Sequence, residues 1–129
     1  VGTSLIESQN CVAIAKKFNS VFSTVGIHPC DCAAHWEKDF KQISLLAQDK
    51  VANRIVAIGE TGLDFYHKPF FVQRQIDAFK AHIDLAIEHD LALVIHVRDA
   101  GQEVLEVLEP YASKKLIRGV IHCFVQDAN

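Results

Sequence analysis

The sequence predicts an α/β fold in which short buried strands alternate with amphipathic helices. Four apolar runs end at or beside a polar residue, and these residues, His28, Glu60, His96 and His122, stand 32, 36 and 26 positions apart. The segments between the runs carry apolar residues at helical spacing. This arrangement is typical of consecutive strand–helix units in a parallel sheet.

Length and composition predict a single folded unit that covers residues 1–129. Half of the residues are hydrophobic, which is enough for a sizeable core. A net charge of -3 and a pI near 6.1 give no basic surface for nucleic acid, which weighs against a simple DNA-binding module. The charge weighs less against a nuclease, because bound metal ions would supply positive charge.

The chain carries no visible membrane or export signal. No run of about 18 uninterrupted apolar residues occurs, so we expect no transmembrane helix. The first residue is Val1 rather than Met and no signal peptide is visible, so we expect the natural N-terminus to be missing. The four cysteines are expected to be thiols in a reducing compartment, which predicts a cytoplasmic protein.

Residues 1–28 predict the end of one strand, a helix and a second strand. Residues 1–5 have the composition of a strand end, and Ser8 is suited to cap the helix that follows. Apolar residues at i, i+3, i+4 and i+7 spacing form the expected buried face: Cys11, Ile14, Ala15 and Phe18. The next strand covers residues 21–28 and ends before Pro29.

The middle of the chain predicts a buried strand between two helices. The first helix has its apolar side at Trp36, Phe40, Ile43 and Ala47. Residues 55–58 are expected to be a short strand buried on both faces, with Glu60 where the strand ends and Gly59 and Gly62 in a tight turn. The strongest helical pattern covers residues 71–90, and it predicts a buried stripe at Val72, Ile76, Phe79, Ile83 and Ala86. His82 and His89 are expected on the surface or rim of this helix.

The last third of the chain predicts a strand, a helix and a final strand. Alternation in residues 91–98 places His96 and Arg98 on the same face. Asp99 and Gln102 have the spacing of a capping box, and Pro110 is expected to help end the helix that they begin. The apolar face of that helix is predicted at Val104, Leu105, Val107 and Leu108. The final strand is expected to end at Phe124.

One carboxylate and two histidines occupy equivalent positions on successive strand–helix units. Glu60, His96 and His122 each stand at or near the carboxyl end of an apolar run. Because such ends meet at one edge of a βα sheet, we expect these side chains to face a common volume. Carboxylate and imidazole are ligands of divalent metals. Each residue taken alone has a structural alternative, as a cap or ion-pair partner or as a hydrogen-bonded core histidine.

Four motifs, in order, resemble the signatures of the TatD family of metal-dependent deoxyribonucleases. They are Val25-Gly-Ile-His-Pro29, Ile58-Gly-Glu-Thr-Gly-Leu-Asp64, Ile95-His-Val-Arg-Asp-Ala100 and Val120-Ile-His-Cys-Phe124. Family members are TIM barrels roughly twice as long as this chain. The resemblance therefore implies a partial TIM (β/α)8 barrel of about four to five parallel βα units, truncated at both ends.

The resemblance also implies a metal site. It assigns Glu60 as a catalytic carboxylate ligand, and His96 and His122 as metal-binding histidines, of a site for two divalent ions such as Mg, Mn or Zn. Such ions lower the pKa of water and stabilise developing negative charge on oxygen. The family set is completed by a His-x-His pair and an aspartate that are not located in this chain. The chain is therefore expected to carry about half of the site.

Two further residues are candidates for substrate contact. Arg98 shares the face of His96, so its guanidinium could hold a substrate phosphate and assist catalysis. The alternative is an ion pair between Arg98 and Asp99 or another carboxylate at the rim. His28 could contact substrate from the mouth of the barrel, or it could have a structural role beside Pro29.

Other polar and aromatic residues near these motifs leave two interpretations open. Asp64 could orient a ligand or a catalytic water, or it could form a turn. Phe65 and Tyr66 could stack on a base, although packing in the connection is also consistent with the sequence. Cys30 and Cys32, flanked by two histidines, could form a small zinc site, but their spacing is not that of a standard finger. The flanking histidines are His28 and His35.

These residues predict a metal-dependent hydrolase of phosphodiesters, and the resemblance implies a TatD-type DNA exonuclease in the full-length form. The expected partner is DNA, single-stranded or at 3′ ends, and not a membrane. An alternative on the same site is hydrolysis of D-aminoacyl-tRNA esters, because activated water also attacks carbonyl carbon. A third hypothesis is a non-catalytic remnant that acts as a binding piece.

Overall fold

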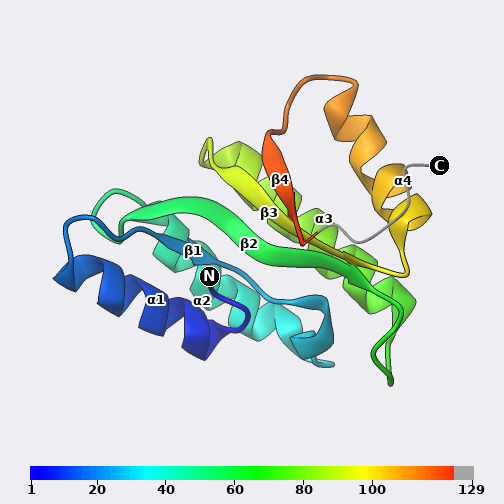
Figure 1. Ribbon diagram of the computed structural model, residues 1–129, viewed down its shortest axis with the longest axis horizontal. Coiled ribbons are helices and arrows are strands. Elements are labelled where there is room, and N and C mark those ends of the chain that lie inside the picture. Colours follow the sequence, from blue (N-terminus) through cyan, green and yellow to red (C-terminus); the bar gives the residue numbers. More distant parts are fainter. Residues whose placement is uncertain (124–129) are drawn as a thin grey trace.

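The computed structural model describes residues 1–123 and has four parallel strands with helices packed along the sheet (Figure 1). The elements, in chain order, are α1 Leu5–Lys17, β1 Ser23–Val25, the 3-10 helix η1 Pro29–Asp31, α2 Trp36–Gln48, β2 Ile55–Asp64, α3 Val72–Glu88, β3 Ala92–Arg98, α4 Gly101–Ala112 and β4 Gly119–His122. The sheet order is β1-β2-β3-β4, and every neighbouring pair is parallel. The predicted α/β class with parallel strands is confirmed. None of the helices within residues 1–123 is long and apolar enough to span a membrane.

The start of the chain differs from the prediction. Residues 1–4 contain no strand, although the Gly2 amide donates to the Thr24 carbonyl at 3.0 Å and the Gly2 carbonyl accepts from the Glu60 amide at 2.8 Å. Helix α1 begins at Leu5, and its N-cap is Ser4, whose hydroxyl accepts from the backbone N–H of Glu7 at 3.3 Å. The prediction of Ser8 as the cap is therefore wrong.

Ser8 instead fixes the buried face of α1. Its hydroxyl donates to the Gly26 carbonyl at 3.3 Å and accepts from the Gly26 amide at 3.1 Å, so this face must lie against the segment after β1. The buried residues of the helix are Ser8, Val12 and Ala15. Ile14 and Phe18 are exposed, so the predicted face was correct only at Ala15.

Strand β2 is longer than predicted. It runs ten residues to Asp64, so Glu60 lies inside the strand rather than at its end, and Val56 is exposed rather than buried. The register with β3 shifts between Ile58 and Thr61. Gly59 and Gly62 do not form a turn: both have φ near +140°, and a Cβ at either position would collide with a backbone carbonyl of β3. These glycines allow the close approach of β3.

Helix α3 buries a histidine that the sequence placed on its surface. His82 is fully buried, its Nδ1 donates to the Ala78 carbonyl at 2.7 Å, and its Nε2 accepts from the Ile27 amide at 3.0 Å. Strand β1 ends at Val25, so the imidazole supplies the acceptor that the Ile27 amide needs. Burial lowers the pKa of His82 to about 4. The predicted buried stripe holds at Phe79, Ile83 and Ala86, whereas Val72 is exposed and Ile76 is half-buried.

Helix α4 begins without the predicted capping box. Its N-cap is Ala100, no side chain caps it, and Gln102 instead donates to Glu106 at 3.1 Å. Asp99 has φ 51°, which takes it out of the conformation that an N-cap requires. Pro110 lies inside the helix, which ends two residues later, and Leu105 is exposed. Strand β4 ends at His122, and Phe124 lies outside the described residues.

Candidate metal and substrate site

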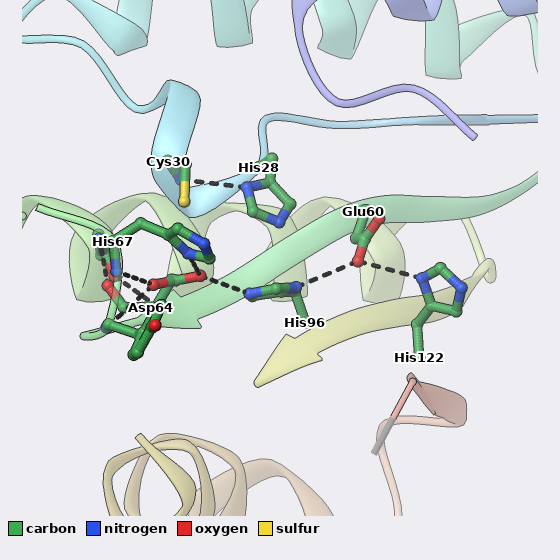
Figure 2. Close-up of polar contacts among 9 residues, drawn as sticks. His28, Cys30, Glu60, Asp64, His67, His96 and His122 are labelled. Carbon is green, nitrogen blue, oxygen red and sulfur yellow. Dashed lines mark hydrogen bonds and ion pairs between the residues drawn. The ribbon is translucent and has the colours of Figure 1, made fainter. Parts of the chain in front are cut away.

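The candidate site lies along the carboxyl-terminal halves of three neighbouring strands. Glu60 and Asp64 come from β2, His96 from β3 and His122 from β4. The register pairs Gly62 with His96 and His96 with His122, so the parallel ladder itself brings these side chains to one edge. Figure 2 shows a continuous line of polar contacts that passes through all four residues.

Glu60 is the centre of the first part of this site. Its Oε1 lies 3.1 Å from His122 Nδ1 and 3.3 Å from His96 Nδ1, and its side chain is 12% exposed. The prediction that these three side chains converge is confirmed. One carboxylate oxygen between two imidazole nitrogens is a donor set that suits a divalent ion. Whether they bind one stays a prediction.

His96 is held from its other side by Asp64. Its Nε2 lies 2.8 Å from Asp64 Oδ2, while its Nδ1 faces Glu60. A histidine that donates one N–H to a carboxylate has a fixed ring and presents its other nitrogen for metal binding. The orienting role that the sequence allowed for Asp64 is therefore supported by a direct contact with His96.

Asp64 is fully buried, and four polar groups contact its carboxylate oxygens. Oδ1 accepts from the backbone amides of Tyr66 at 3.0 Å and His67 at 2.8 Å, and Oδ2 lies 2.8 Å from both His67 Nδ1 and His96 Nε2. Burial alone would raise the pKa of Asp64, but these hydrogen bonds outweigh it and hold the pKa well below its usual range. Asp64 also forms the turn after β2, because it accepts from amides two and three residues ahead.

His28 lies against His96, and one of its ring nitrogens already accepts a hydrogen bond. The two rings meet edge to face with centroids 4.2 Å apart, and His28 Nδ1 accepts from the Cys30 amide at 3.1 Å. Because a backbone N–H can only donate, the proton of neutral His28 must be on Nε2. Burial, with a smaller effect from His96, lowers the pKa of His28. His28 is thus a neutral donor beside Glu60 and His96, whose ligand atoms lie within 4.8 Å of its own.

Arg98 has no carboxylate partner within residues 1–123. Its Nε is buried without a hydrogen bond, and its guanidinium lies 4.6 Å from the centre of the Tyr66 ring. The predicted alternative of an ion pair with Asp99 is therefore wrong for the described part of the chain. Tyr66 supports this cation, while Phe65 packs on Phe70 with ring centroids 5.4 Å apart.

The cysteines do not form the zinc site that their spacing allowed. Cys32 is buried, with its Sγ 3.8 Å from the Arg74 carbonyl, and His35 is exposed. Cys30 instead faces Asp64 and His67, and the ligand atoms of these three residues lie within 4.8 Å of one another. The sequence did not indicate His67 or the approach of Cys30 to Asp64. The spacing of Asp64 and His67, three residues apart in a turn, was the available signal.

The fold and the site are those of an α/β protein that carries metal-binding residue types along the carboxyl-terminal halves of parallel strands. The family described as TatD related DNase matches residues 1–129, and the chain belongs to that family. This confirms the resemblance that the four sequence motifs indicated.

Relatives of this chain carry the same family name. The 3'-5' ssDNA/RNA exonuclease TatD of Enterobacter lignolyticus is 40% identical over 124 residues, which is 95% of this chain and 46% of that protein. The protein of the same name from Escherichia coli K12 is 38% identical over 125 residues, again 95% of this chain and 46% of the relative. The chain thus spans about half the length of these relatives.

Solved structures confirm the fold. A TatD homologue from Escherichia coli K12 superposes with a TM-score of 0.87 at 23% identity, covering 98% of this chain and 48% of the other. A TatD family hydrolase from Entamoeba histolytica gives a TM-score of 0.81 at 22% identity, covering 97% and 44%. The architecture is therefore that of about half of a TatD-type barrel, as the sequence predicted.

Proposed function

We propose that this chain supplies part of the active site of a metal-dependent hydrolase that cleaves phosphodiester bonds in single-stranded DNA or RNA from a 3′ end. The observation that carries the proposal is the contact of Glu60 Oε1 with imidazole nitrogens from two neighbouring strands, at 3.1 and 3.3 Å. The names of the relatives, which are 3'-5' ssDNA/RNA exonucleases, support this substrate class.

In this proposal Glu60, His96 and His122 hold metal. A bound divalent ion supplies activation of water and neutralises charge that develops on the phosphate oxygens. Asp64 keeps His96 in place, because its Oδ2 accepts from the ring nitrogen that does not face Glu60. Mg, Mn and Zn are the candidate ions, and two ions are expected in a complete family site.

Arg98 and His28 are proposed to bind the substrate. Arg98 is free of carboxylates within residues 1–123, and the Tyr66 ring fixes its position, so its planar donors can take a phosphate. His28 is an uncharged donor at Nε2, because its Nδ1 is already used. Both residues would hold the phosphate while the metal site acts on it.

We also propose a cytoplasmic location. The four cysteines, Cys11, Cys30, Cys32 and Cys123, are free thiols, which fits a reducing compartment.

A single-stranded DNA labelled at its 5′ end tests the function. With Mg²⁺ or Mn²⁺, the purified full-length protein should shorten this DNA stepwise from the 3′ end, and Glu60→Gln should lower the rate by more than about 100-fold, because the amide keeps the shape but loses the charge. His89→Gln, on the rim of α3, is the matched control and should retain activity.

Two outcomes would contradict the proposal. Release of the amino acid from D-aminoacyl-tRNA without cleavage of DNA would assign the site to ester hydrolysis. Failure to act on either substrate, with metal still bound at Glu60, would favour a non-catalytic binding piece.

A further inference from the structure

We propose that Cys30, Asp64 and His67 form a separate, thiol-containing site for a zinc ion at the margin of the Glu60 cluster. The three donors differ in kind and come from three places: η1, the end of β2 and the turn that follows it. This inference does not depend on hydrolytic activity. It concerns a second group of metal-binding atoms that uses neither Glu60 nor His122.

The positions of the donor atoms suit a single ion. The Cys30 Sγ, an Asp64 carboxylate oxygen and a His67 ring nitrogen all lie within 4.8 Å of one another, and His67 Nδ1 is 2.8 Å from Asp64 Oδ2. Ligand atoms around tetrahedral zinc are separated by about 3.3 to 3.8 Å, given bonds of about 2.0 to 2.3 Å. Displacements of about 1 Å therefore convert the present cluster into a metal site.

The two outer donors are free to make that adjustment. Cys30 is exposed, and the side chain of His67 is 60% exposed, whereas that of Asp64 is fully buried. Figure 2 shows the Cys30 sulfur pointing toward the pair formed by Asp64 and His67. An ion can reach the site from solvent, and water can occupy the fourth position.

The Asp64 carboxylate also has no Lys or Arg partner within residues 1–123. The partners of this buried carboxylate are imidazoles, backbone amides and the Cys30 thiol. A divalent ion bound here would supply the cationic partner that no Lys or Arg within residues 1–123 provides. Oδ2 contacts both His67 and His96, so the two groups of ligands meet at Asp64.

The types of donor atom in Cys30, Asp64 and His67 indicate which metal would bind. A thiolate with an imidazole and a carboxylate favours zinc over magnesium or calcium, which prefer oxygen ligands. Because the ligand is the thiolate, the Cys30 thiol releases its proton to solvent when the ion binds. Cobalt(II) accepts the same ligands as zinc and serves as the coloured probe.

Titration of the purified chain with cobalt(II) tests the proposal. A thiolate-to-cobalt absorption band in the near ultraviolet should develop for the wild-type chain and for Cys32→Ser, the matched control with its thiol two residues away. Cys30→Ser should abolish the band, and His67→Gln should weaken cobalt binding by at least about 10-fold. Zinc bound per chain should fall by one equivalent in Cys30→Ser.

Glu60→Gln separates this proposal from the proposed function. That variant should keep the thiolate–cobalt band even if it loses nuclease activity, because Glu60 is not among the three ligands. A band that persists in Cys30→Ser, or a wild-type chain without any band, would overturn the zinc site and leave the hydrolase proposal untouched. Melting temperatures of the variants show whether each remains folded. If Cys30→Ser does not fold, His67→Gln decides: unchanged cobalt affinity would overturn the proposal.

Discussion

Two histidines of this chain, His82 and His96, are surrounded by different kinds of partner. His82 lies in the core, and its two nitrogens bond to backbone groups of Ala78 and Ile27. His96 lies at the strand ends, 20% exposed at its side chain, and its two nitrogens face the carboxylates of Asp64 and Glu60. The first arrangement fixes a neutral imidazole in the fold. The second arrangement presents an imidazole and carboxylates to the same space.

The partners of each imidazole distinguish a structural histidine from one that is able to bind a ligand. Backbone partners use up both nitrogens of His82, so no nitrogen is left to bind a ligand. The nitrogens of His96 and His122 face carboxylates instead. A cation could bind to these nitrogens and to the carboxylates together, which would leave no buried group unpaired. The same division predicts which substitutions change stability and which change metal binding or rate.

His82→Ala should have the largest effect on stability. The substitution removes two hydrogen bonds, leaves the Ile27 amide without an acceptor and opens a cavity, so the free energy of unfolding should fall by about 3 kcal/mol or more. His122→Ala, at a side chain 48% exposed, should change it by less than about 0.5 kcal/mol. Urea denaturation of both variants measures this. Equal losses would remove the distinction between the two kinds of histidine.

The pH dependence of stability should also depend on His82. Its folded pKa of about 4 is below the ordinary value of 6.5, so between these values the unfolded chain binds more protons than the native chain. The stabilisation is therefore complete above pH 6.5 and is lost as pH falls toward 4, by about 3 kcal/mol in total.

Urea unfolding at several pH values checks this dependence. His82→Gln should show a flatter profile than the wild type between pH 6.5 and 4. Parallel profiles for the two proteins would contradict the buried, neutral state of His82.

Arg98 and Arg54 can be compared in the same way as the two histidines, with smaller expected effects. Arg98→Lys keeps the charge but loses the planar donors, so catalytic efficiency should fall by 10-fold or more, roughly 1.4 kcal/mol, with an unchanged melting temperature. Arg54 is the matched control, because it donates to the backbone carbonyls of Val21 and Asn19. Arg54→Lys should lower the melting temperature and leave the rate of the folded protein unchanged. The reverse pattern would show that Arg98 is structural.

The sequence could predict the strand-borne part of the site because strand position determines it. Each of Glu60, His96 and His122 follows an apolar run, and parallel pairing then brings their side chains together. The fold class followed from the same alternation of runs and helical patterns.

Contacts that depend on tertiary packing could not be predicted in this way. His82 faces inward because β1 ends early and leaves the Ile27 amide without a sheet partner. The continuation of β2 to Asp64 depends on the close approach of β3 to Gly59 and Gly62. His67 and Cys30 meet Asp64 through turns, whose geometry no apolar periodicity records.

Binding of manganese(II) tests most directly whether Glu60 and the imidazoles of His96 and His122 hold the metal. Manganese favours carboxylate and imidazole over thiolate, so it reports on Glu60, His96 and His122 rather than on Cys30. The wild-type chain should bind it weakly, as titration followed by electron paramagnetic resonance can measure, and His82→Gln should bind it equally well. Glu60→Gln and His122→Gln should lose the binding. Unchanged manganese affinity in both of these variants would contradict the account.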